Sequence, residues 1–315
     1  MRQEARPLVL LILAAACWGL GTVISKRAVE AIPPITLLVL QLAASLVVLG
    51  LALRRRALPP SDRPIPPVLA RLGILNPGIA YALTLVGLTQ ISASLSVLLW
   101  TTEPLLIIVL AAMFLGERIG PAVVSLSAVA ALGMVLVLYE PGLSGSLLGI
   151  AVTLIGVACC AVYTVVSRRF IGDLDLTGPV VVAQQTYALA FAAAAFVVVA
   201  VAGVPVGMSD TSPVVWASAI GSGVLYYGAA YLAYLAALRR LAASIAAASF
   251  YLIPVFGIAG GVLLLDERLA SLQWIGAAIV LVAVATILRR TVTTPGADTD
   301  LARTAPLGAP VIDPP

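Results

Sequence analysis

Long stretches without charged residues constrain the fold of this chain more than any other feature of its sequence. These apolar runs occupy residues 7–25, 31–53, 119–139, 141–167, 176–209, 211–238, 241–265 and 269–288. A further run, 72–116, is interrupted only by Glu103 and is long enough for two membrane helices. Because a helix that spans a bilayer needs about 20 apolar residues, the sequence predicts ten transmembrane helices in an all-α polytopic membrane protein. The runs are continuously apolar rather than alternating, which argues against transmembrane strands.

The composition agrees with this interpretation. Hydrophobic residues make up 62% of the chain and charged residues 10%, whereas soluble domains carry roughly 25% charged residues. With the N-terminus inside, only Lys26, Arg27 and Arg268 of the 18 basic residues fall on the outer side. The positive-inside rule therefore predicts that both termini are cytoplasmic, and we expect a plasma-membrane protein. Because the basic residues follow the topology, the net charge of +4 indicates no nucleic-acid partner.

The chain contains an internal repeat, in which residues 81–118 align with 231–268 without a gap. The matched pairs include Tyr81/Tyr231, Ala93/Ala243, Ser94/Ser244, Pro104/Pro254, Glu117/Glu267 and Arg118/Arg268. Similar segments at 22–24 and 164–166 extend the repeat to the first helix of each half, with a shifted register. Five helices per half is an odd number, so the two halves would enter the membrane from opposite sides. Inverted repeats of this kind are typical of secondary transporters.

The repeat predicts the domain boundaries. Helices one to five would occupy 1–140, helices six to ten 141–290, and a disordered cytoplasmic tail, rich in Pro, Thr and Asp, 291–315. We expect the first helix to end at Ser25-Lys26-Arg27. The N-terminus also resembles a signal peptide, with a lipoprotein-like cleavage site at Ala14-Ala15-Ala16-Cys17. Cleavage there would leave the sixth helix without its counterpart, so an uncleaved helix is the better interpretation.

Glu103 is the only ionisable residue deep inside a predicted span. A charge at the centre of a membrane helix costs roughly 2.5–3.5 kcal/mol on insertion scales, so this carboxyl should face the interior of the bundle. It could couple transport to protons or bind a substrate ammonium. Alternatively, it could be a neutral acid that is hydrogen-bonded to a neighbouring helix. The second copy of the repeat carries Ile253 at this position. A charge that is present in only one of two similar copies slightly favours a functional role for Glu103.

Each copy of the repeat has a proline at the same position. Pro104 and Pro254 each remove a backbone donor and loosen their helix, so each is a candidate hinge, although a static kink that shapes a cavity would explain them too. Glu117-Arg118 and Glu267-Arg268 lie at predicted helix ends, where capping and interfacial anchoring are the simpler explanation.

Aromatic and amide side chains inside the spans are the other candidates for a binding cavity. Tyr227, Tyr231 and Tyr234 share one face of the eighth helix, although packing alone would explain such a stripe. The predicted substrate-binding residues are Trp18, Gln41, Asn76, Tyr81, Trp100, Glu103, Tyr163, Gln184, Tyr227, Tyr231 and Tyr251. The chain has no histidine and its three cysteines lie in apolar runs, so we expect no metal site and no cofactor.

Several of these motifs resemble the EamA-type family of the drug/metabolite transporter superfamily. The similarity rests on Trp18-Gly19, Lys26, Pro104 with Gly116-Glu117-Arg118, and Pro254 with Asp266-Glu267-Arg268. It covers residues 8–289 and implies a secondary carrier, often an exporter of amino acids, metabolites or drugs. It also implies a central cavity lined mainly by helices 1, 3, 4, 6, 8 and 9. The family pattern has Gly at position 266, where this chain has Asp.

We therefore expect a carrier that exports a small neutral, zwitterionic or cationic metabolite or drug, with amino-acid-like chemistry, by alternating access. No basic residue lies at mid-span, which argues against phosphorylated substrates. The expected partners are the small-molecule substrate and the lipid bilayer, and a homodimer stays open. A non-transporting scaffold or a flippase subunit for a lipid-linked substrate is the alternative. We do not expect an enzyme, because one buried carboxyl without histidine supplies no nucleophile–base pair.

Overall fold

The computed structural model describes residues 2–55, 64–88, 90–91, 99–137, 146–171, 176–210, 212–265 and 271–293. All elements in these ranges are helices, as the apolar runs predicted. They are α1 (Arg2–Ala31), α2 (Pro34–Arg55), α3 (Pro67–Gly73), η1 (Ile74–Ile79), α4 (Ala80–Leu88), α6 (Glu103–Phe114), α7 (Pro121–Val137), α8 (Leu147–Ile171), α9 (Thr177–Val201), α10 (Pro213–Gly223), η2 (Val224–Ala229), α11 (Ala230–Leu238), α12 (Ala243–Ala248), η3 (Ser249–Tyr251), α13 (Leu252–Leu265) and α14 (Ser271–Thr293).

Six helical stretches in the described part of the chain are long and apolar enough to cross a membrane. They are Arg6–Ser25, Pro34–Arg54, Leu147–Ile171, Thr177–Val201, Pro213–Leu238 and Leu272–Arg290. Glu103–Phe114, Pro121–Leu136 and Ala243–Gly257 are shorter apolar helices. The predicted third helix is divided into α3, η1 and α4. The count of ten membrane crossings therefore stays a prediction.

Two predicted boundaries are wrong. The first helix does not end at residues 25–27 but continues to Ala31. Lys and Arg end an apolar run without disfavouring a helix, and the chain leaves the helix just before Pro33-Pro34. At the other terminus, α14 continues to Thr293, so the first three residues of the predicted tail are helical. The rest of that tail and the turn between the halves, at 138–145, lie outside the described residues.

Prolines mark the beginnings of several helices. The chain has proline at the first position of α2, α3, α7 and α10, and at the second position of α6. Proline is favoured there because the first helical amides have no partner within the helix and its fixed φ already suits the helix. These residues therefore define where an otherwise uniform apolar sequence divides into separate helices.

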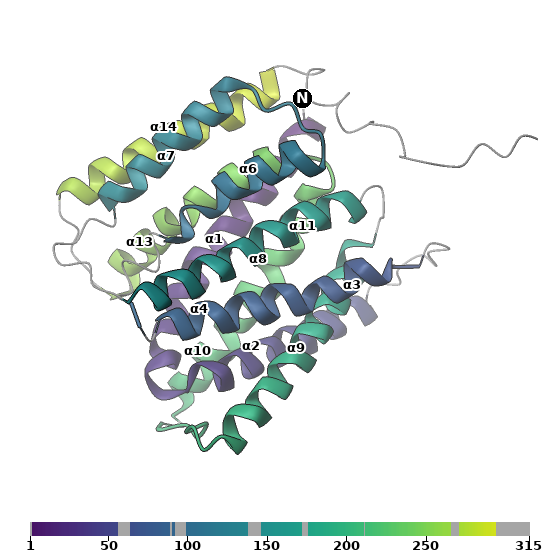
Figure 1. The fold of residues 1–315 in the computed structure, drawn as a ribbon, viewed down its shortest axis with the longest axis vertical. Coiled ribbons are helices and arrows are strands. Elements are labelled where there is room, and N and C mark those ends of the chain that lie inside the picture. The colour runs from purple at the N-terminus through teal and green to yellow at the C-terminus, as the bar shows by residue number, and fades with distance from the viewer. Residues whose placement is uncertain are drawn as a thin grey trace, which may run out of the picture.

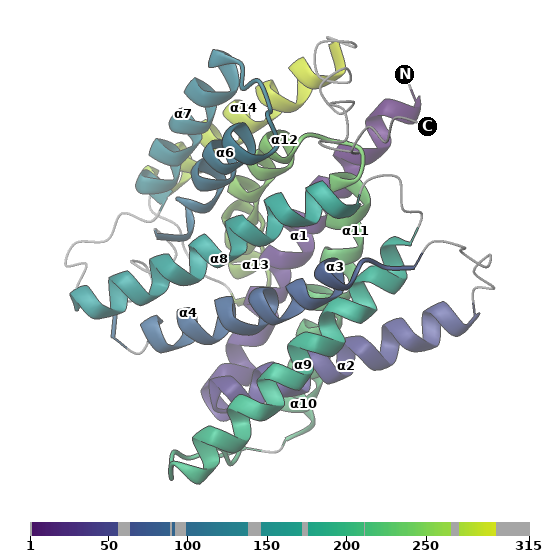
Figure 2. The same cartoon turned by 45° about the vertical axis from the view of Figure 1, so that its right-hand side comes forward.

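Helices of one predicted half pack against helices of the other half (Figures 1 and 2). α1 lies inside the bundle against α10, α11 and α13, while α8 packs against α3, α4 and α6. α3 packs against α9, and α10 packs against α2. Two further pairs, α2 with α9 and α7 with α14, join helices from opposite halves. α7 and α14 lie side by side at one edge of the molecule in both views.

A π-helical segment interrupts one helix in each half. These segments, η1 and η2, are separated by the same offset as the sequence repeat. A glycine precedes each of them, and each glycine allows a close helix approach. A β-carbon at Gly73 would lie 1.7 Å from the carbonyl oxygen of Gln184, and one at Gly223 would lie 2.6 Å from that of Gln41. Small residues permit such contacts between membrane helices, and the two contacts occupy equivalent places.

Candidate functional site

Aromatic side chains gather inside the bundle into one connected group, which we call the aromatic cluster. Among the described residues, nine rings are linked by contacts between ring centroids of 5.1–6.5 Å. The cluster consists of Trp18, Tyr81, Trp100, Tyr163, Tyr226, Tyr227, Tyr231, Tyr234 and Phe250. Because its members come from both predicted halves, the cluster lies where the halves meet.

Trp18 of α1 makes the largest number of these ring contacts. Its ring lies 5.4 Å from Tyr234, 5.5 Å from Phe250, 5.6 Å from Tyr231 and 6.5 Å from Tyr226, each in an edge-to-face arrangement. Aromatic pairs favour this geometry because the positive edge of one ring meets the negative face of the other. The side chain is buried, yet its indole nitrogen finds no hydrogen-bond acceptor among the described residues. Trp18 therefore offers an unused donor beside four aromatic rings.

The tyrosine hydroxyls join the π-helical segments to the neighbouring helices. Tyr231 donates a hydrogen bond of 3.1 Å to the side-chain oxygen of Asn76, and Tyr81 donates one of 2.7 Å to the hydroxyl of Tyr226. In the register of the repeat, Asn76 corresponds to Tyr226 and Tyr81 to Tyr231. The two bonds are therefore equivalent contacts across the boundary between the halves, made with different acceptors.

Glu103, the first residue of α6, is 8% exposed. Among the described residues it has no hydrogen-bond partner and no ion-pair partner. Its carboxylate lies within electrostatic range of Tyr226, Tyr234 and Cys160. Two of these, Tyr226 and Tyr234, also contact the Trp18 ring. Buried polar groups are normally hydrogen-bonded to protein or water. The Glu103 carboxylate and the Trp18 indole N–H, which both lack partners among the described residues, therefore have two tyrosines of the cluster in common.

Most of the predicted binding residues belong to this site. Trp18, Tyr81, Trp100, Tyr163, Tyr227 and Tyr231 lie in the aromatic cluster. Asn76 is hydrogen-bonded to the cluster, and Glu103 lies within electrostatic range of it. Gln184 also touches the cluster, because its side-chain oxygen accepts a 2.8 Å hydrogen bond from Tyr163. Its nitrogen donates to the backbone oxygen of Leu69 at 2.9 Å, so this glutamine also ties α9 to α3.

Gln41 and Tyr251 lie apart from the cluster. Gln41 donates a 2.9 Å hydrogen bond to Ser222, which joins α2 to α10. Tyr251 is buried and makes no ring contact among those found in the described residues, where its hydroxyl also has no hydrogen-bond partner. The predicted hinges both lie in the first turn of a helix: Pro104 is the second residue of α6 and Pro254 the third of α13. A turn at residues 101–102 precedes α6, whereas the 3-10 turn η3 precedes α13 within a continuous helical run.

Sequence reasoning left Tyr226, Tyr234 and Phe250 out of the predicted site. Tyr234 belongs to the tyrosine stripe of the eighth helix, and Tyr226 adjoins it, so the stripe already indicated both. Phe250 occupies the position of the repeat that corresponds to Trp100. A symmetric search for counterparts of the predicted residues would have found it.

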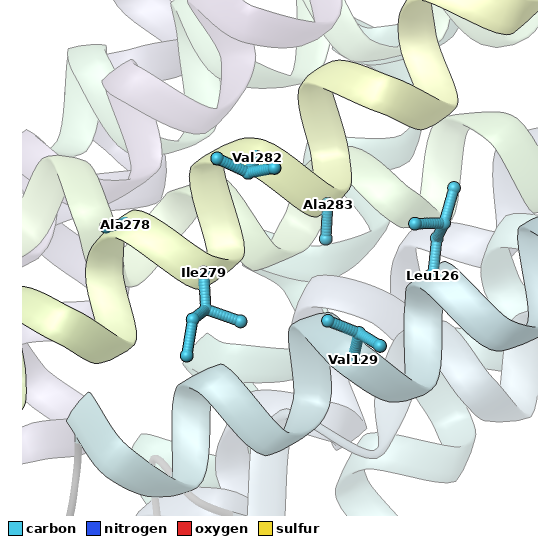
Figure 3. A pocket seen from close by; sticks show the side chains of 6 residues that line it. All are labelled: Leu126, Val129, Ala278, Ile279, Val282 and Ala283. Atoms are coloured by element: carbon cyan, nitrogen blue, oxygen red, sulfur yellow. The ribbon is translucent and has the colours of Figure 1, made fainter.

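A groove on the edge of the molecule is a poor candidate for the functional site. It has a volume of about 350 Å³ and lies between α7 and α14 (Figure 3). Its lining is Leu126, Val129, Ala278, Ile279, Val282 and Ala283. No side chain in this lining carries a polar group, and none belongs to the aromatic cluster. The groove can therefore offer packing to an apolar chain but no directional recognition.

Comparison with known proteins agrees with this geometry. The model of the EamA-like transporter family matches residues 5–139 and again residues 147–289. The chain belongs to this family. The resemblance seen in its motifs is therefore confirmed, and this EamA-like transporter is a multi-pass membrane protein. Members of the family are transporters rather than enzymes.

Two further proteins are similar over most of the chain. An uncharacterized transporter of Archaeoglobus fulgidus is 24% identical over 289 residues, which cover 90% of this chain and 98% of the relative. A protein of known crystal structure superimposes with a TM-score of 0.72 at 20% identity, over 89% of this chain and 97% of the other. The second similarity shows that the EamA-like transporter shares its fold with an experimentally determined structure.

Proposed function

We propose that this EamA-like transporter is a secondary carrier for a small amino-acid-like zwitterion or organic cation, which it exports by alternating access. The observation that carries the proposal is Glu103, a buried carboxylate that has no partner among the described residues and lies within electrostatic range of two tyrosines of the aromatic cluster. A substrate ammonium would supply the missing positive charge. The faces of the surrounding rings attract a cation within about 6 Å of their centroids.

The unused donor at Trp18 supports a zwitterionic substrate. The Trp18 ring contacts Tyr226 and Tyr234, and the Glu103 carboxylate lies within electrostatic range of the same two tyrosines. A substrate that carries both an ammonium and a carboxylate would satisfy the acceptor and the donor together. The sequence supplies no basic side chain at mid-span, and a phosphorylated substrate would need one.

The arrangement of the helices supports alternating access. The family model matches the chain twice, and its two matches fall within the predicted halves, 1–140 and 141–290. The pairs α3–α9 and α10–α2, the π-helical segments and the glycine contacts recur at equivalent places. Inverted repeats give a carrier two similar gates on either side of one central site. We infer ten membrane crossings in two inverted halves.

The distribution of charges supports one orientation in the membrane. Most basic residues fall on one side of the predicted topology, so we infer that both termini are cytoplasmic, and we propose the plasma membrane as the location. Its partners would be the substrate and the surrounding lipid, and the groove between α7 and α14 would accommodate an acyl chain or a second copy in a homodimer.

The test is substrate flux into proteoliposomes, with the wild type compared with Glu103→Gln and Glu103→Asp. Amino acids, primary amines and amphiphilic cations would be screened, and proton movement recorded in parallel. We expect Glu103→Gln to reduce transport at least tenfold, because the amide keeps the size of the side chain but cannot pair with an ammonium or exchange a proton. Glu103→Asp should retain part of the activity, since it keeps the charge.

Asp210→Asn is the matched control, because Asp210 is an exposed acid that bonds to Ser212 in its own loop. It should transport at the wild-type rate. Unchanged flux in Glu103→Gln would exclude the role proposed for this carboxyl and leave a carrier that is coupled elsewhere. A wild type that moves none of these compounds, but forms a stable complex with a membrane partner, would favour the scaffold or flippase-subunit alternative.

A further inference from the structure

Glu117 joins the two halves of the protein at one end of the bundle. It follows α6, whose last turn closes at Gly116, a glycine with φ of +67° that lies in open space. Such a left-handed residue ends a helix and redirects the chain. The amide of Glu117 still bonds back to the carbonyl of Ala111 at 3.3 Å, so the position of Glu117 relative to α6 is fixed. This end of α6 lies at the same end of the molecule as the N-terminus (Figures 1 and 2).

The Glu117 carboxylate does not cap its own helix but the beginning of another one. One oxygen accepts a 2.7 Å hydrogen bond from the amide of Ala243. The other accepts a 3.1 Å bond from the amide of Ser244 and a 2.6 Å bond from its hydroxyl. These donors begin the helical run of α12, η3 and α13. Hydrogen bonds to a charged acceptor are roughly twice as strong as neutral ones, and the positive end of a helix favours an anion.

The same helical run leads directly to the aromatic cluster. Residues 243–249 are all buried, and α12 packs against α6. The next residue, Phe250, places its ring 5.1 Å from Tyr234 and 5.5 Å from Trp18. A change in the position of α12 would therefore be transmitted to the cluster through a few rigid residues. Glu117 itself is only half-buried, so water can replace its partners when the contact opens.

We propose that Glu117 is a positioning residue of the transport cycle, which holds α6 and α12 together and thereby keeps this end of the bundle closed while Phe250 is held in the cluster. The inference rests on the proposed alternating-access function. The residue types of the contact recur in the repeat, at Ala93, Ser94 and Glu267, which lie outside the described residues. In the opposite state of the cycle, the carboxylate releases α12 and is solvated.

The test combines hydrogen–deuterium exchange of residues 241–250 with transport by the full chain in proteoliposomes. The variants form a graded series: Ser244→Ala removes one of the three hydrogen bonds, Glu117→Gln weakens those to the charged oxygens, and Glu117→Ala removes all three. We expect amide exchange in this segment to become faster along the series, by at least tenfold in Glu117→Ala. The maximal transport rate should change in the same order, with a smaller change in KM.

Two comparisons separate this role from ordinary structural support. Asp210→Asn removes an acid that also accepts a backbone amide, but within one loop, and it should change neither measurement. Ser244→Ala should have no further effect in the Glu117→Ala background, because residues that act through one contact are not additive.

The possible outcomes exclude the positioning role and the transport function separately. If the wild type transports substrate while Glu117→Ala shows unchanged exchange and an unchanged maximal rate, the positioning role is wrong and the carrier function stands. Additive effects of the two substitutions would also exclude a shared contact. If exchange rises in Glu117→Ala but the wild type moves no substrate, the transport function and this role within it both fail, and the contact is a structural tie.

Discussion

Alanine at Gly73 is expected to prevent the chain from forming this helix bundle. The added β-carbon would lie 1.7 Å from the carbonyl oxygen of Gln184 and 2.4 Å from its carbonyl carbon. Both are backbone atoms of α9, so no side-chain rotation can relieve the overlap, and the two helices would have to move apart. Overpacking in a tight interior typically costs about 1–3 kcal/mol and occasionally more. We expect Gly73→Ala to exceed this range, because separating α3 from α9 also strains the hydrogen bond from Gln184 to Leu69.

The measurement is the yield and melting temperature of the monodisperse protein in detergent, by fluorescence-detected size-exclusion chromatography. Gly223→Ala should be milder, since its β-carbon would lie 2.6 Å from the backbone of Gln41. Gly50 and Gly221 lie in helices but would place a β-carbon in open space, so Gly50→Ala and Gly221→Ala should melt like the wild type. Normal melting of Gly73→Ala would show that α3 and α9 are not packed this closely.

The extent of the helices could be predicted because a bilayer imposes one length on every apolar run. The apolar run 211–238 ends at the same residue as the helical run formed by α10, η2 and α11 and begins only two residues before it. The interruptions inside such runs were not predicted. η1 forms where Pro77 removes an amide and Asn76 takes non-helical angles, φ −145° and ψ 122°, but η2 forms at the equivalent place without any proline. Its break therefore depends on packing against other helices, which no local pattern records.

The candidate site could be predicted to the extent that it uses rare residue types. Glu103 is conspicuous in an apolar helix, and the tyrosine stripe indicates a common face. The use of each amide was not predictable, because Gln41 and Gln184 look equivalent in the sequence but bond differently. Gln41 meets Ser222 away from the cluster, whereas Gln184 accepts from Tyr163 within it. Only the arrangement of α2 and α9 around the cluster distinguishes these two residues.

The two predicted halves share features of their helix packing but differ in their buried side chains. The glycine contacts and π-helical segments recur, whereas Glu103 has Ile253 as its counterpart and Asn76 has Tyr226. A symmetric frame allows two similar conformations to have similar free energies, as alternating access requires. Different side chains at equivalent positions would place the polar recognition on one side of the proposed site, so the proposed substrate would bind there in one orientation.

Trp18 makes more ring contacts than any other member of the aromatic cluster. Trp18→Ala should abolish measurable substrate binding and lower the melting temperature. It removes four edge-to-face contacts, and truncating a buried Trp or Phe to Ala typically costs about 3–5 kcal/mol. Trp18→Phe keeps an aromatic ring but lacks the indole N–H. We expect this variant to melt nearly normally and to bind an amino-acid-like zwitterion at least tenfold more weakly.

Binding would be measured by isothermal titration calorimetry on the detergent-solubilised protein, with the zwitterion compared with the matching amine that lacks its carboxylate. If the indole N–H donates a hydrogen bond to the substrate carboxylate, Trp18→Phe should weaken binding of the zwitterion. Binding of the amine should be almost unaffected, because it depends on Glu103. Trp274→Ala is the control, since this tryptophan of α14 is 58% exposed and lies outside the cluster. Equal losses for both ligands in Trp18→Phe would mean that the ring supports the shape of the site but binds no carboxylate, and the substrate would then be an organic cation.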